Sequence, residues 1–433
     1  MAFVQEAPKE GFRLSMLIYD TRYRAITIQV VVLFLFLLFL SWLVNNTIAN
    51  LAAKDRTFDF GFLWMRAGYD INQTLIPYTN DSTHMRAAVI GLLNTLLSAL
   101  VGCTIATVLG VVIGVLRLSK NWLVSRLMTL YVEIFRNVPV LLWILLAATL
   151  LSETMPEPKD FKVTQAMVES GAEPAASNIL FGTVAITNRS SLIPAPLLDR
   201  PLGGMEIASI PVNFSLLAVL AVFIGSVLVN ARFLRRVKAI QEETGERPVT
   251  WWKSLAILFV PVIALLMAMG FHLEIPGFPT DASGVSKGFN FKGGIEVLHS
   301  FSALTLALAL YTAAFIAEIV RSGIMAIARG QSEAAFALGL RPARTMRLVI
   351  LPQALRVIIP PLISQYLNLT KNTSLAIAVS YMDLRGTLGG ITLNQTGKEL
   401  ECMLLMMGIY LVISLIISSV MNAFNRAVKL KER

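Results

Sequence analysis

The feature that most constrains this chain is a series of apolar runs long enough to cross a lipid bilayer. Residues 25–44 and 87–116 contain no charged side chain. A helix needs about 20 residues to cross about 30 Å of hydrocarbon. Hydrophobic residues make up 55% of the 433 residues and charged residues only 15%, more apolar side chain than a water-soluble core needs. The sequence therefore predicts an all-α polytopic membrane protein.

Eight apolar runs are candidate membrane spans. They cover residues 25–44, 87–116, 127–151, 210–229, 254–270, 301–317, 354–382 and 402–421. Pro261 should bend the fifth span, because proline cannot donate a helix hydrogen bond. The seventh should be broken by Pro360, Pro361 and a polar run that begins at Lys371. We expect about eight transmembrane helices.

The distribution of basic residues predicts the orientation of these spans. Eight crossings place both termini on one side of the membrane. With the N-terminus inside, most of the 37 Lys and Arg residues fall in segments that face the cytoplasm, as the positive-inside rule requires. We therefore expect both termini to be cytoplasmic. The net charge of +10 then reflects membrane topology and gives no reason to expect nucleic-acid binding.

The polar loop between the sixth and seventh spans has the pattern of two short helices joined by a turn. Ser332 is a suitable N-cap, and Glu333 would then lie in the first turn, where it complements the helix dipole. Two alanines follow, and Gly339 can adopt the left-handed conformation that ends a helix. Three arginines at intervals of three then mark one side of a second helix, expected to stop near Pro352. The alternative is an interfacial amphipathic helix without a partner.

The same loop resembles the EAA loop of bacterial ABC importer permeases. The matching residues are Glu333, Ala334, Ala335, Gly339, Leu351 and Pro352, with Val349 where the family usually has Ile. Further stretches in residues 91–151 and 301–425 resemble the polar amino acid subfamily. The enlarged plan of this chain is similar to permeases of glutamate, glutamine, aspartate and asparagine uptake systems and to general L-amino acid permeases.

This resemblance implies a type I ABC importer permease core with extra helices. Residues 1–86 would form an N-terminal anchor helix and a periplasmic segment, and residues 87–151 the first part of the core. Residues 152–300 would be a periplasmic loop and an insert with two extra helices. Residues 301–433 would complete the core and carry the coupling loop, 321–356.

The implied function is import of polar L-amino acids from periplasm to cytoplasm by alternating access across the bacterial inner membrane. The implied partners are an ABC ATPase dimer, a second homologous permease subunit, a periplasmic amino acid-binding protein and membrane lipid. ATP and Mg²⁺ would bind the ATPase, and this chain should bind no cofactor and have no catalytic or metal site. Gly397-Lys398 is not a phosphate loop, because Thr392 stands where that motif needs glycine.

The resemblance and the intramembrane polar groups together suggest two sets of site residues. The family assigns ATPase coupling to Glu333, Ala334, Ala335, Gly339, Leu351 and Pro352. Because polar groups inside spans tend to face a cavity, the substrate path could include Lys371, Asn372, Thr373, Ser374, Asn94 and Thr95.

Each of these assignments has a structural alternative. Lys371 could mark the outer end of its span and reach water, and Asn94 and Thr95 could make interhelical hydrogen bonds. Two acid–arginine pairs spaced three residues apart are expected to be structural ion pairs on one helix face. These pairs are Glu133 with Arg136 and Glu318 with Arg321.

Two other classes of protein compete with an ABC permease. An ion-coupled secondary amino acid transporter also has broken helices and buried charges, but it does not need a docking loop, and the sequence lacks the usual inverted repeat. A membrane-embedded enzyme is disfavoured because the three histidines lie far apart without metal-ligand spacing.

Overall fold

Helices dominate the chain, as the apolar runs predict. The computed structural model describes residues 16–53, 57–207, 210–245 and 248–428. It divides into two compact units, Met1–Phe62 and Leu63–Arg433. Within the described residues, seven helices are long and apolar enough to cross a membrane, or up to eight if a bent pair forms one span. This confirms the expectation of about eight spans; the positions of both chain ends lie outside the described residues.

The first unit contains the short α1 (Met16–Tyr19) and the long α2 (Thr21–Ala53). Large apolar side chains are exposed along the whole of α2. A helix that is apolar on all sides belongs in lipid or against other membrane helices. This helix is the predicted N-terminal anchor, extended beyond residues 25–44.

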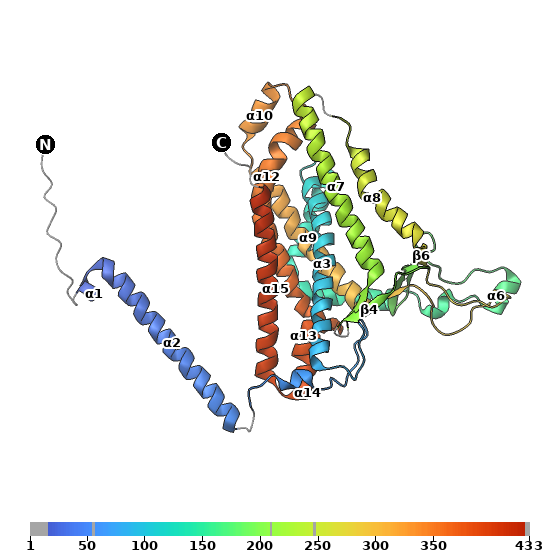
Figure 1. The fold of residues 1–433 in the computed structure, drawn as a ribbon, viewed down its shortest axis with the longest axis horizontal. Coiled ribbons are helices and arrows are strands. Elements are labelled where there is room, and N and C mark those ends of the chain that lie inside the picture. Colours follow the sequence, from blue (N-terminus) through green and yellow to red (C-terminus); the bar gives the residue numbers. More distant parts are fainter. Residues whose placement is uncertain (1–15, 54–56, 208–209, 246–247, 429–433) are drawn as a thin grey trace. The chain divides into compact units, whose positions relative to one another are not determined.

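Close packing between α3 (His84–Leu116) and α9 (His299–Met325) forms the centre of the second unit (Figure 1). Gly110 and Gly114 of α3 face α9 so closely that a Cβ atom on Gly114 would lie 2.7 Å from the carbonyl oxygen of Ala317. Small residues at such a crossing let two membrane helices approach closely, which increases their van der Waals contact.

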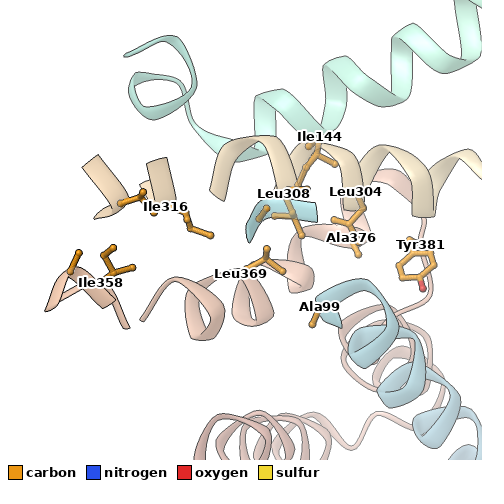
Figure 2. Packing of buried hydrophobic residues seen from close by; sticks show 14 residues of the cluster. Ala99, Ile144, Leu304, Leu308, Ile316, Ile358, Leu369, Ala376 and Tyr381 are labelled. Atoms are coloured by element: carbon orange, nitrogen blue, oxygen red, sulfur yellow. The ribbon is translucent and has the colours of Figure 1, made fainter. Parts of the chain in front are cut away.

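A continuous apolar core surrounds this helix pair. Figure 2 shows Leu304 and Leu308 of α9 beside Ile144, with Leu369 and Ala376 completing the cluster. Ile144 belongs to α5 (Val140–Thr154), Leu369 to α12 (Leu351–Asn372) and Ala376 to η4 (Thr373–Val379). All five side chains are buried.

The third predicted span, 127–151, is not one straight helix. The chain forms α4 (Trp122–Asn137) and α5, which meet at 105°. Val138 between them is extended, with φ −107° and ψ 135°. The following Pro139 disfavours helical geometry at Val138, because its ring clashes with the preceding residue. The bend leaves α4 as an element distinct from the 15-residue α5.

The seventh span is longer than predicted, and it is broken in the predicted polar run but not at Pro360 and Pro361. The helical segment Pro342–Val379 consists of α11 (Pro342–Thr345), the π-helical η3 (Met346–Ile350), α12 and the 3₁₀-helical η4. The chain therefore stays helical through Pro352 instead of stopping there, because Pro352 lies in the first turn of α12, where a missing N–H donor is tolerated. Pro360 and Pro361 also lie inside α12. The break comes after Asn372 and ends at Ser380, where φ is +57°.

The insert 152–300 contains two long helices and a small set of strands. The helices are α7 (Phe214–Thr244) and α8 (Trp251–Ala268), with Pro261 inside α8. The fourth span begins at Phe214 and not at residue 210, because residues 210–213 form a strand. Asn213 then caps the helix by accepting bonds from the backbone N–H groups of Ser215 and Leu216.

Seven short strands form three antiparallel sheets in this insert. Their orders are β1-β2-β7, β3-β6 and β4-β5. The strands are β1 (Ala185–Ile186), β2 (Ser190–Ile193), β3 (Ala195–Leu198), β4 (Gly204–Ile207), β5 (Ile210–Asn213), β6 (Phe271–Glu274) and β7 (Ile295–Leu298). Phe161, Phe278 and Phe291 pack beside them as a small separate core. The segment is thus an ordered β-containing insert.

The remaining short elements lie in the loops and in the insert. They are η1 (Gly61–Trp64), η2 (Pro158–Phe161), α6 (Gln165–Ser170), α10 (Arg329–Ala337), α13 (Leu384–Gly386), the π-helical η5 (Thr387–Thr392) and α14 (Leu393–Thr396). The last helix is α15 (Glu399–Val428). Figure 1 shows α10 at one end of the bundle and α13 and α14 at the opposite end.

Candidate functional site

The loop between α9 and α12 begins earlier than the sequence pattern suggested. Its helix α10 starts at Arg329, with Ala328 in the N-cap position. Ser332 therefore lies inside the helix, where its hydroxyl donates to the carbonyl oxygen of Arg329 at 2.7 Å. The predicted N-cap role of Ser332 is wrong, and Glu333 is not in the first turn. The chain turns helical soon after α9 ends, with Gln331 N–H bonded to the Ala328 carbonyl at 3.0 Å.

The end of α10 is a tight turn at Gly339. Its φ is +77°, the left-handed conformation predicted for this residue. The Gly339 N–H donates to the Phe336 carbonyl at 2.9 Å, and the Leu340 N–H donates to the Ala335 carbonyl at 3.1 Å. This pair of bonds is a Schellman motif, which satisfies two carbonyls that a helix end otherwise leaves unpaired.

We name residues 329–340 the coupling knuckle. Ala335 is buried against its own chain, whereas Glu333 and Ala334 are exposed. Phe336 and Leu338 are also exposed, Leu338 at 82% of its surface. Exposed large apolar side chains beside an alanine and an acid mark a surface suited to contact with another protein.

The coupling knuckle is attached to the membrane helix that follows it. The side-chain amide of Gln353 on α12 donates to the Gln331 side chain at 3.3 Å. Leu351 is exposed and Pro352 is half-buried at the start of α12. Arg344 and Arg347 are exposed. The knuckle is therefore connected to α9 and α12, which both contribute buried side chains to the core.

The polar run at the end of α12 mostly bonds to its own backbone. Lys371 is exposed, Asn372 and Ser374 are half-buried, and Thr373 is buried. The Thr373 hydroxyl donates to the Thr370 carbonyl and the Ser374 hydroxyl to the Lys371 carbonyl, both at 2.8 Å. In this conformation the two hydroxyls stabilise the turn into η4.

Asn94 and Thr95 bind the segment that follows η4. The Asn94 amide donates to the Met382 carbonyl at 2.9 Å and to the Gln73 carbonyl at 3.0 Å. Thr95 Oγ1 accepts from the backbone N–H of Leu384 at 3.0 Å. Both side chains are fully buried, so they hold separate segments together in this conformation, the structural alternative proposed for them.

Asp383 is a buried acid that the sequence patterns did not single out. Its carboxylate caps α13 by accepting from the Gly386 N–H at 2.8 Å, and it accepts from the Tyr410 hydroxyl at 3.3 Å. It lies between the candidate spans Pro342–Val379 and Glu399–Arg426. Burial raises the pKa of Asp383 to about 7, and its hydrogen bonds only partly oppose this effect. An acid directly after an apolar span and before a Leu-Arg-Gly turn is the sequence signal that could have identified it.

The raised pKa of Asp383 predicts that the folded protein loses stability as pH rises. The folded state holds the proton up to about pH 7, whereas the ordinary pKa is 3.8. The contribution of Asp383 to the free energy of unfolding is therefore fully present below pH 3.8. It falls by roughly 1 to 4 kcal/mol as pH rises through 7. Thermal unfolding at pH 5 to 8 should show a steeper decline for wild type than for Asp383→Asn, which retains an acceptor for Gly386. Parallel declines in the two proteins would contradict this assignment.

A cluster of charged side chains lies where α3, α4 and α9 meet. Glu318 on α9 pairs with Arg321 at 2.8 Å, as predicted, and also with Arg117. Arg136 lies 3.9 Å from Glu318, and no ion pair joins it to Glu133 in the described part of the chain. The predicted Glu133–Arg136 pair is therefore wrong: Arg136 turns toward α9, and Glu133 accepts from Asn137 at 3.3 Å.

The bundle also contains an apolar cavity of about 570 Å³ between α3, α12 and α15. The hydroxyl groups in its wall are already bonded. Thr107 donates to the Cys103 carbonyl at 2.7 Å, and its hydroxyl lies 2.7 Å from that of Tyr366. The cavity offers a charged zwitterion few partners, and burying charges without partners is costly. Its walls suit apolar groups.

Three comparisons report what this chain is similar to. Residues 248–430 match the family described as "Binding-protein-dependent transport system inner membrane component". A solved structure described as "Crystal structure of an amino acid ABC transporter with histidines" has a TM-score of 0.42 and 18% identity, covering 79% of this chain and 95% of that one.

Two curated relatives match along nearly their whole length. The general L-amino acid transport system permease protein AapQ of Rhizobium johnstonii is 40% identical, covering 98% of this chain and 96% of the relative. The glutamate/glutamine/aspartate/asparagine transport system permease protein BztB of Rhodobacter capsulatus is 64% identical, covering 100% of both chains.

Proposed function

The chain belongs to the family of binding-protein-dependent transport system inner membrane components, as a permease subunit of an ABC amino acid importer, and we propose that it carries glutamate, glutamine, aspartate and asparagine inward. As a multi-pass inner membrane permease it works with an ATPase and an external binding protein. The four substrates are those in the name of the 64% identical relative.

The observation that carries the mechanism is the exposed coupling knuckle at one end of the bundle. A permease that binds no nucleotide needs a surface through which ATPase closure can move its helices. We assign that role to Glu333, Ala334, Ala335, Gly339, Leu351 and Pro352. The knuckle lies directly between α9 and α12, so its displacement would shift the two helices against α3.

This assignment also fixes the proposed orientation and assembly. The end of the bundle that carries α10 faces the cytoplasm, both termini lie on that side, and α13, α14 and the β-containing insert face the periplasm. Two ATPase subunits offer two docking surfaces and this chain has one coupling knuckle, so a second homologous permease subunit completes the transporter. ATP and Mg²⁺ bind the ATPase, and no step of hydrolysis takes place on this chain.

The substrate path stays a proposal built on the polar groups near η4. Lys371, Asn372, Thr373 and Ser374 lie at the break of the seventh span, and Asn94 and Thr95 face the segment just beyond it. Because the buried members of this set now bond to backbone, opening a path between them requires those bonds to exchange. Alternating access supplies such an exchange when the spans rock.

Uptake by the complete reconstituted transporter tests this function. With binding protein outside and ATP inside proteoliposomes, labelled glutamate should accumulate, and excess unlabelled glutamine, aspartate or asparagine should reduce its uptake. A non-hydrolysable ATP analogue should abolish accumulation, whereas a protonophore should leave it unchanged. Accumulation that needs an ion gradient and not ATP hydrolysis would overturn the proposal.

A further inference from the structure

Three arginines from separate segments converge on a single glutamate. Arg117 follows α3, Arg136 ends α4, and Arg321 lies near the end of α9. All three contact or approach the carboxylate of Glu318, the closest being Arg117 and the most distant Arg136 at 3.9 Å. Three guanidinium groups around one carboxylate leave an excess of positive charge.

The arginines also retain unused hydrogen-bond donors. The Arg117 side chain is only 6% exposed, yet its Nε–H has no acceptor within the described residues. The Nε–H of Arg321 also has none there. Arg136 has only the long 3.9 Å approach to Glu318 and a cation–π contact with the ring of Phe315, at 5.4 Å. Both Nε–H groups are buried, so an anion from outside would meet the guanidinium groups of Arg136 and Arg321, whose side chains are 37% and 32% exposed.

The surface of α4 is suited to a position at the level of lipid headgroups. Val132 is buried against α3 and α9, together with Met128 and Phe135. A second stripe on α4 is apolar and exposed, at intervals of four, three and four residues: Leu123, Leu127, Leu130 and Ile134. Arg126 is exposed on the helix as well. A helix with a packed face, an exposed apolar stripe and charged residues lies along a membrane surface, with its apolar side chains in the acyl region.

We propose that Arg136 and Arg321, with the buried positive charge of Arg117 behind them, bind the phosphate of an anionic phospholipid. Guanidinium groups match phosphate oxygens in geometry and charge. The stripe on α4 would contact the acyl chains of the same lipid. Placing this lipid in the inner leaflet rests on the proposed function, because it follows from a coupling knuckle in the cytoplasm. Lipid binding itself does not rest on that function.

A lipid at this position would bear on transport, because α9 leads into α10 within four residues. Its phosphate would hold the ends of α3, α4 and α9 together directly beside the coupling knuckle. An anionic lipid is therefore expected to stabilise one arrangement of these helix ends. Free phosphate shares the same chemistry, and the test must separate the two sources.

The test measures lipid retention by the purified complex. Arg136→Gln is the informative variant, because among the described residues Arg136 pairs only with Glu318 at 3.9 Å, and its loss leaves the closer pairs of Glu318 with Arg117 and Arg321 intact. Arg126→Gln is the matched control, an exposed arginine of the same helix. Phosphatidylglycerol is titrated against each protein, and bound lipid is counted by native mass spectrometry, with phosphatidylcholine as the neutral lipid. Thermal unfolding verifies that each variant is folded.

Arg136→Gln should bind phosphatidylglycerol about fivefold more weakly than wild type, the effect expected of one basic residue near an anionic lipid. Arg126→Gln should remain close to wild type, and phosphatidylcholine binding should not change. An equal loss in both variants, or no loss in Arg136→Gln, would overturn the site. Displacement of the lipid by excess inorganic phosphate would show a site for free phosphate and overturn the lipid assignment. Because the measurement needs neither ATP nor substrate, its failure is distinguishable from failure of the transport function.

Discussion

Replacing Glu333 by lysine should lower ATP-driven uptake at least about tenfold while the chain still folds and enters the membrane. Glu333 is exposed on α10, and no ion pair involving it occurs among the described residues. Its replacement therefore removes little from the fold. In the complex, however, docking would desolvate the new charge opposite a surface adapted to an acid. A penalty of about 1.4 kcal/mol or more for this misplaced charge weakens docking tenfold or more. Uptake and ATPase rates in proteoliposomes measure the effect.

A matched control separates docking from a general effect of charge. Glu242 on α7 is also an exposed helical acid, 3.7 Å from Lys238. Exposed pairs of this kind contribute little to stability. Glu242→Lys should therefore leave uptake near wild type, and the ATPase should co-purify with it. Normal uptake with Glu333→Lys would remove the basis for assigning the coupling knuckle to the ATPase.

Replacing Gly114 by leucine should destabilise the permease by about 3 kcal/mol. A Cβ atom on Gly114 would lie 2.7 Å from the Ala317 carbonyl oxygen and 2.9 Å from Cβ of Val320. Neither atom is at the end of a flexible side chain, so α3 and α9 would have to separate. Thermal unfolding of the purified complex, together with the amount of chain in the membrane fraction, measures the loss.

Gly408 provides the corresponding control. It lies in α15, and a Cβ atom there would meet nothing within 4 Å. Gly408→Leu should therefore unfold near the wild-type temperature, with any small change coming from higher helix propensity. Similar destabilisation by both substitutions would show that the cost comes from bulk in a membrane helix and not from the α3–α9 contact.

Only the end of the first helix in the coupling loop was predicted correctly from the local sequence. The end of α10 at Gly339 follows from its own conformational freedom, and the structure confirms a left-handed residue there. The start was mispredicted because several residues before Ser332 can also begin a helix, and the end of α9 determines which one does. Pro352 was expected to stop the next helix, but it lies in the first turn of α12, directly after the π-helical η3, where proline is tolerated.

The ion pairs also include one that the sequence predicted and one that it did not. The Glu318–Arg321 pair is confirmed, since residues three apart share a helix face. The same spacing failed for Glu133 and Arg136, because the bend before Pro139 brings the end of α4 against α9, where Glu318 lies. Spacing predicts which side chains can meet on one helix and cannot identify a partner on another.

By itself, the sequence determined the membrane class, the number of spans and the family. These follow from run lengths and local motifs, because hydrocarbon accepts a backbone only when its polar groups bond within the helix. Only the tertiary structure decided that Asn94 and Thr95 bind residues near Asp383, and that Arg117 and Arg136 join Arg321 around Glu318. Those contacts join residues far apart in the sequence, and they depend on how closely glycines let α3 approach α9, a distance that no local pattern encodes.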